Sequence, residues 1–72
     1  MNLCNRLKEI RVQKGLTQEA LANVVGVTRQ TVIAVEKGKF VPSAKLALEL
    51  AKALDTEFKA LFWLQNNEGE KS

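Results

Sequence analysis

Residues 17–38 read TQEALANVVGVTRQTVIAVEKG, and this stretch determines the predicted fold. It contains two short amphipathic helical patterns, each opened by a threonine and separated by one glycine. Thr17 and Thr28 carry hydroxyl groups that can cap a helix N-terminus. Gly26 lies where the first helix must end and the chain must turn, a place that favours a positive φ and therefore glycine. The stretch predicts two consecutive helices joined by a tight turn.

Each predicted helix has an apolar residue just before its cap and another five positions later. These pairs are Leu16 with Leu21 and Val27 with Val32. The spacing is that of the hydrophobic staple, which fixes the angle at which the chain enters a helix. Two short helices joined in this way form a helix-turn-helix, whose second helix can lie in a DNA major groove. We therefore expect the helix at 29–37 to contact DNA.

The stretch and its surroundings resemble the phage repressor and Cro-like family of helix-turn-helix proteins, the xenobiotic-response-element type. LKEIRVQKGLTQEALA is similar to the family's first two helices, VTRQTVIAVEKGKFVPS to its recognition helix and following loop, and LALELAKAL to its fourth helix. Several elements agree in their order over roughly residues 5–64, which a chance match to one element would not give. The resemblance implies a DNA-binding transcriptional regulator, usually dimeric. The chain is similar in size to the family's smallest stand-alone dimeric members, such as the cytolysin repressor.

Hydrophobic periodicity predicts an all-α fold of five helices over residues 1–64, followed by a polar tail at 65–72. The resemblance implies that these helices form a compact repressor-like DNA-binding domain. The helices are expected at 6–14, 18–25, 29–37, 44–54 and 57–61. Asn5, Ser43 and Thr56 can cap the first, fourth and fifth of them. The residues expected to face the core are Leu3, Leu7, Ile10, Leu21, Val25, Val27, Val32, Val35, Leu46, Leu50, Ala51 and Leu54. The resemblance implies that the ending Phe62-Trp63-Leu64 pairs with the N-terminal residues in a short β-ribbon, although residues 1–4 show no clean alternation.

The chain has 72 residues and a formal net charge of +3, and its positive charge lies mostly in the first half. No acidic residue occurs between Glu19 and Glu36, a stretch that includes the predicted DNA-contacting helix. This distribution suits a polyanionic partner, although small charge differences between the halves of a chain are common. A chain this short buries only about 60% of its unfolded surface, so we expect dimerisation to supplement its core.

The composition argues against several other classes of protein. Cys4 is the single cysteine, so we expect a small apolar filler rather than a disulfide framework or zinc site; a reactive thiol or an intermolecular disulfide is the alternative. The chain has no histidine, no tyrosine and no glycine-rich phosphate loop, so we expect no enzyme activity, metal or cofactor. No signal peptide or membrane-spanning run is visible, and we expect a cytoplasmic protein without a membrane partner.

The candidate DNA contacts fall into a base-reading set and a phosphate-binding set. The base-reading set lies at the cap and on the exposed face of the helix at 29–37: Thr28, Arg29, Gln30, Thr31, Ile33 and Ala34. Arginine can donate two hydrogen bonds to guanine, glutamine can pair with adenine, and isoleucine can touch a thymine methyl group. The phosphate-binding set is Gln18, Lys37, Lys39, Lys14 and Arg6. For each lysine, a solvated surface charge is an equally good interpretation.

Two further sets of residues have predicted structural roles. The predicted dimer interface consists of Leu48, Phe62, Trp63 and Leu64, because a chain this small has little core to bury the last three and an exposed apolar cluster marks an interface. The alternative is that Phe62 and Leu64 pack internally. The resemblance implies that Arg11 and Glu36 form a partly buried ion pair, which makes Glu36 a scaffold residue rather than a functional acid.

We therefore expect a sequence-specific double-stranded DNA-binding transcriptional regulator, a repressor, that binds an inverted repeat as a homodimer. The alternative is an antitoxin-type module that binds a partner protein and regulates its own synthesis, since the same fold serves both roles. An antitoxin would copurify with its partner, whereas a simple repressor would purify alone. A small-molecule effector is not expected, although nothing in the sequence argues against one.

Overall fold

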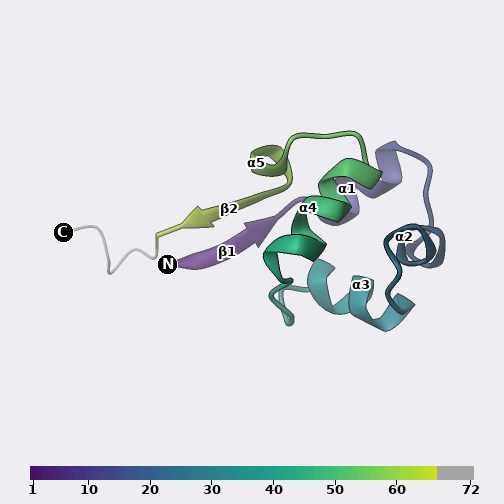
Figure 1. The fold of residues 1–72 in the computed structure, drawn as a ribbon. Helices are drawn as coiled ribbons and strands as arrows, with labels where there is room; N and C mark the ends of the chain where they lie inside the picture. The colour runs from purple at the N-terminus through teal and green to yellow at the C-terminus, as the bar shows by residue number, and fades with distance from the viewer. Residues whose placement is uncertain (67–72) are drawn as a thin grey trace.

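A computed structural model of the chain describes residues 1–66. Within them, the order of elements is β1 (Asn2–Asn5), α1 (Leu7–Gln13), α2 (Gln18–Val25), α3 (Arg29–Glu36), α4 (Ala44–Ala53), α5 (Phe58–Leu61) and β2 (Phe62–Gln65). The helices form one body, and β1 and β2 extend away from it as an antiparallel ribbon (Figure 1). The predicted five-helix fold with a terminal β-ribbon is confirmed.

Local signals in the sequence set most of the helix ends. Thr17, Thr28 and Ser43 are the N-cap residues of α2, α3 and α4. Each side-chain oxygen accepts a hydrogen bond from the backbone N–H three residues later, which satisfies a donor that the helix itself leaves free. Gly26 ends α2 in the left-handed conformation, at φ 77°. These caps are the ones that the sequence predicts.

The end of α4 differs from the prediction. Thr56 does not cap α5, because Glu57 occupies the N-cap position. The backbone N–H of Thr56 donates to the carbonyl oxygen of Ala51 at 3.0 Å. The N–H of Asp55 donates to the carbonyl oxygen of Lys52 at 3.1 Å, with Asp55 in the left-handed region at φ 53°. Together these bonds close α4 in a Schellman motif. Since Thr56 helps to end α4, α5 begins one residue later than predicted, after Glu57, which makes no side-chain capping bond.

Asn5 is not the N-cap residue of α1, as predicted, but lies one residue before it and makes two hydrogen bonds. Arg6 occupies the N-cap position without a side-chain capping bond. The Oδ1 atom of Asn5 instead accepts from the backbone N–H of Leu7 at 3.0 Å. Its Nδ2 atom donates to the carbonyl oxygen of Val35 at 3.1 Å. Asn5 thus joins the end of β1 to the start of α1 and to the last turn of α3.

The core is built from apolar side chains of the five helices and of β2. Its buried residues are Leu7, Leu21, Ala22, Val32, Val35, Ala47, Leu50, Ala51, Leu54, Leu61 and Phe62. Partly buried apolar side chains around them include Ile10, Leu16, Val25, Val27 and Leu46. Most of the predicted core residues are in these two sets. Leu3 is not, because the ribbon carries it beyond the helices and leaves it 37% exposed.

One face of the ribbon is buried in the core near the helices and exposed farther from them. The register pairs Leu3 with Leu64 and Asn5 with Phe62, and directly opposed residues share a face. Phe62 and Leu64, two residues apart, also lie on this face. Phe62 is only 3% exposed, whereas Leu64 is 62% exposed. The part of the ribbon that extends past the helices (Figure 1) therefore presents Leu3 and Leu64 to solvent, and we name this pair the ribbon patch.

The folded region extends slightly beyond the expected domain end at Leu64. Gln65 belongs to β2 and pairs with Asn2. Residues 67–72, which make up most of the expected polar tail, lie outside the described residues. No helix formed by residues 1–66 is both long and apolar enough to cross a membrane.

Candidate nucleic-acid interface

The first turn of α3 presents Arg29 and Gln30 to solvent. Two hydrogen bonds hold the cap before them, since Thr28 Oγ1 accepts from the N–H of Thr31 at 3.3 Å and lies 3.1 Å from Thr31 Oγ1. Within the described residues, the side chains of Arg29 and Gln30 take part in no hydrogen bond or ion pair. Two polar side chains that can each bind one base bidentately are therefore available on a fixed helical turn.

Two other predicted base-reading residues, Ile33 and Ala34, are half-buried. Val32 and Val35 occupy the inward face of α3 and are each 2% exposed. Ile33 and Ala34 thus lie on the flank of the helix, and only part of each side chain is accessible from outside. The apolar contact that they can offer is smaller than a fully exposed position would allow.

Arg11 and Glu36 form the ion pair that the family resemblance implies. Arg11 Nε lies 2.6 Å from Glu36 Oε2, and the two side chains are only 9% and 5% exposed. Arg11 Nη1 also donates to the carbonyl oxygen of Leu16 at 2.8 Å. The pair is more deeply buried than the partly buried pair that the resemblance implies. It connects α1 to the last turn of α3.

Gln18, a predicted phosphate-binding residue, is a third member of this network. Its Nε2 atom donates to Glu36 Oε1 at 3.1 Å, and the side chain is half-buried. Both carboxylate oxygens of Glu36 are therefore engaged, one by Arg11 and one by Gln18. The bond brings the start of α2 beside the last turn of α3. The sequence gives no sign of it, because the two residues are 18 positions apart and meet only through the tertiary fold.

The three predicted lysine contacts lie at helix ends and are exposed. Lys37 is the C-cap of α3 and Lys39 follows two residues later, while Lys14 is the C-cap of α1, just before α2. In the described part of the chain, none of the three side chains forms an ion pair or hydrogen bond. Among these residues, their positive charges are therefore not neutralised by neighbouring carboxylates.

Arg6 differs from the lysines because its side chain is already engaged. Its Nε atom lies 3.8 Å from Glu9 Oε1, and its Cζ atom lies 5.5 Å from the centroid of the Trp63 ring. A guanidinium group at this distance from an indole is attracted by the ring. Arg6 thus links the start of α1 to β2.

The four predicted dimer-interface residues differ in exposure. Leu48 on α4 is 56% exposed and Leu64 is 62% exposed, so both are accessible to a partner. Phe62 is not, and its assignment to the interface is wrong. It faces the core on the inner part of the ribbon, where its ring centroid lies 5.8 Å from that of Phe58. Trp63, on the opposite face of β2, is half-buried beside Arg6.

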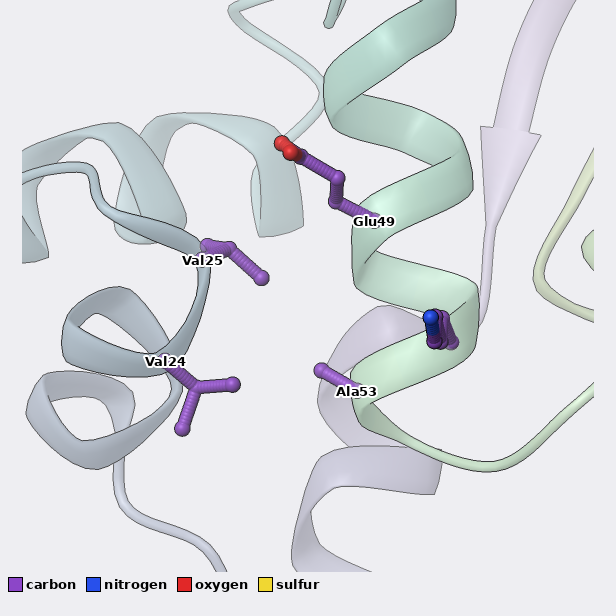
Figure 2. Close-up of a pocket in the computed structure, with 5 residues that line it drawn as sticks. Val24, Val25, Glu49 and Ala53 are labelled. Carbon is purple, nitrogen blue, oxygen red and sulfur yellow. The ribbon is translucent and has the colours of Figure 1, made fainter.

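A surface hollow of about 410 Å³ lies between α2 and α4 (Figure 2), and it is lined by Val24, Val25, Glu49, Lys52 and Ala53. It shares no residue with the candidate DNA contacts. Its carboxylate is already paired, since Glu49 Oε2 accepts from Lys45 Nζ at 2.8 Å. Across residues 1–66, no three His, Cys, Asp or Glu side chains gather where they could hold a metal ion.

Comparison with known proteins gives a consistent result. Residues 7–61 match the helix-turn-helix family HTH_3. The chain is 51% identical over 61 residues to the uncharacterized HTH-type transcriptional regulator YgzD of Bacillus subtilis, covering 85% of this chain and 92% of that protein. It is 47% identical over 64 residues to the uncharacterized HTH-type transcriptional regulator MJ0272 of Methanocaldococcus jannaschii, covering 89% and 97%. The crystal structure of the restriction-modification controller protein C.AhdI from Aeromonas hydrophila is similar with a TM-score of 0.73 and 45% identity, over 76% of this chain and 80% of that one.

Proposed function

Because this chain belongs to the helix-turn-helix family HTH_3 and is a DNA-binding transcriptional regulator, we propose that α3 reads base edges in a major groove. The observation that carries the proposal is the exposure of Arg29 and Gln30, unengaged within the described residues, in the first turn of α3. Arginine suits the two acceptors of guanine, and glutamine suits the donor and acceptor of adenine. Ile33 and Ala34 would add apolar contact with thymine methyl groups, beside Thr28 and Thr31.

A second set of residues would hold the DNA backbone. Gln18, at the start of α2, and the exposed lysines 14, 37 and 39 lie near the ends of α1, α2 and α3. Contacts of this kind with phosphates fix register and supply salt-dependent affinity, but carry no sequence preference. Arg6 would have to leave Trp63 and Glu9 to join them, so we assign it to the ribbon instead.

The proposed active form is a homodimer. The ribbon patch, Leu3 and Leu64, continues the core-facing side of the ribbon but is exposed, and a second copy of the chain would cover it. Leu48, exposed on α4, is a further proposed interface residue. A two-fold dimer would place its two α3 helices about 34 Å apart, on successive major grooves of an inverted repeat. We further propose that the dimer represses transcription, by occupying the DNA of its site.

Selection of DNA fragments from a random pool by the purified protein tests this proposal. The expected result is enrichment of a two-fold symmetric site whose half-site centres are about 10–10.5 base pairs apart, or a multiple of that distance. Absence of any enriched sequence would overturn base reading by α3. Enrichment of a single unsymmetric half-site would overturn the dimeric mode and leave base reading intact.

A further inference from the structure

The carboxylate of Glu36 has two partners, and only one of them balances its charge. Glu36 is 5% exposed in its side chain, and Arg11 Nε lies 2.6 Å from its Oε2 atom. This ion pair alone would neutralise the buried carboxylate. The other oxygen, Oε1, accepts a hydrogen bond from Gln18 Nε2 at 3.1 Å. The second bond connects the buried pair to a residue at the start of α2.

This bond fixes which end of the Gln18 carboxamide faces inward. A glutamine carboxamide has an acceptor oxygen and a nitrogen with two donor hydrogens. Beside a carboxylate only the nitrogen end is attractive, because two acceptor oxygens repel each other. One N–H of Gln18 is therefore directed at Glu36, and the second N–H and the carbonyl oxygen remain for an external partner. A glutamine without such an anchor would keep its rotamer freedom and lose it only on binding.

We propose that Glu36 is a positioning residue for DNA binding, which holds the Gln18 carboxamide so that its remaining N–H donates to a DNA phosphate. The inference rests on the proposed function. It gives Glu36 a part in binding through Gln18, although a carboxylate near DNA repels phosphate. That repulsion is small here because Arg11 neutralises the charge of Glu36. A donor ordered before the DNA arrives contributes more affinity than one that must be ordered on binding.

Two double variants separate this role from the role of the ion pair. Both Arg11→Met/Glu36→Gln and Arg11→Met/Glu36→Met remove the two buried charges and keep side chains of similar length. Only the first keeps an acceptor for Gln18 Nε2. We expect the first to bind the selected DNA site nearly as tightly as the wild type. The second should bind about two- to tenfold more weakly, because Gln18 can still donate to the phosphate but must then be ordered on binding.

Repeating the comparison in the Gln18→Ala background shows whether the loss of DNA affinity depends on Gln18. There, the two double variants should bind equally, since no carboxamide remains to be positioned. Ethylation of single phosphates provides a second readout: modification of the phosphate that Gln18 contacts should weaken the wild type and leave Gln18→Ala unaffected. Affinities are measured well below the melting temperature of each variant, so that partial unfolding does not contribute.

Three results would overturn the inference. Equal binding by the two double variants in the chain that keeps Gln18 would show that Glu36 acts only as a scaffold. A difference between them that persists in the Gln18→Ala background would show that it acts through another residue. Both results leave the proposed function standing. If the wild-type chain itself selects no DNA sequence, the proposed function fails and this inference fails with it.

Discussion

Asn5 Nδ2, at the end of β1, donates a hydrogen bond to the carbonyl oxygen of Val35, 3.1 Å away in the last turn of α3. The other end of the same carboxamide accepts from the backbone N–H of Leu7 at the start of α1. One side chain therefore joins the ribbon to two helices. Since we propose that the ribbon forms the dimer interface and that α3 reads DNA, Asn5 fixes the position of one relative to the other.

Asn5→Ala should lower the free energy of unfolding by about 1–3 kcal/mol, because it removes two hydrogen bonds worth about 0.5–1.5 kcal/mol each. Asn5→Ser is the matched control: its hydroxyl can still accept from the N–H of Leu7 but is too short to reach Val35. Its stability should fall between those of the wild type and Asn5→Ala. Urea denaturation provides the measurement, and equal midpoints for all three proteins would show that neither bond contributes.

Arg11→Met should lower the melting temperature strongly. The loss of one partner leaves the carboxylate of Glu36 buried and unpaired, and such a loss costs about 3–5 kcal/mol when a pair is buried. For a domain of this size, each 1 kcal/mol corresponds to a shift of about 4–8 °C. Adding Glu36→Met removes the stranded charge and should recover most of the loss. An unchanged melting temperature in Arg11→Met would contradict this account of the pair.

Asp55→Gly should raise the free energy of unfolding by about 0.5–1 kcal/mol, because the left-handed conformation is strained for residues with a Cβ atom. Asp55, at φ 53°, ends α4 in the position that Gly38, at φ 74°, takes at the end of α3. The reverse change is the control. Gly38→Ala should cost about 1–2 kcal/mol through the backbone alone, since a Cβ atom there meets nothing within 4 Å. Thermal unfolding of both variants checks the pair, and a stability change of the same sign in both would contradict the explanation.

Leu3→Ser/Leu64→Ser should convert the protein to a monomer without unfolding it, because both side chains are exposed in the single chain. Analytical ultracentrifugation at micromolar concentration gives the oligomeric state, and circular dichroism shows that the fold is kept. Val12→Ser, at a 59% exposed site on α1, is the control and should leave the association unchanged. A double variant that still sediments as a dimer would place the interface elsewhere.

Local chemistry explains how much of the fold can be predicted from the sequence. The threonine caps, the staple pairs and Gly26 act within a few residues of each other, and the structure has α2 at Gln18–Val25, the bounds predicted. The prediction at Thr56 is wrong because a non-glycine residue, Asp55, takes the left-handed position that closes α4. Phe62 is wrongly predicted as exposed because the sequence does not indicate where the helices stop covering the ribbon.

The long-range polar contacts could not be predicted from local patterns. The hydrogen bond from Asn5 to Val35 spans 30 residues, and the one from Gln18 to Glu36 spans 18. The sequence alone predicts that Arg6 is a solvent-exposed cation. Its contact with Trp63 depends on the pairing of β1 with β2, which joins distant parts of the chain. The ion pair of Arg11 and Glu36 could be predicted because the family resemblance supplies the tertiary information that the residues themselves lack.

The central claim, that the first turn of α3 reads bases, is tested most directly by comparing the DNA-selection profiles of Gln30→Ala, Lys39→Ala and the wild type. Gln30→Ala should lose preference at one base pair in each half-site, worth about 1–3 kcal/mol, and keep its salt dependence. Lys39→Ala should keep the sequence profile, bind all sequences more weakly, and reduce the salt slope by about one unit, since one lysine–phosphate interaction is removed. Indistinguishable profiles and salt slopes for the two variants would contradict the assignment of this helix face to base reading.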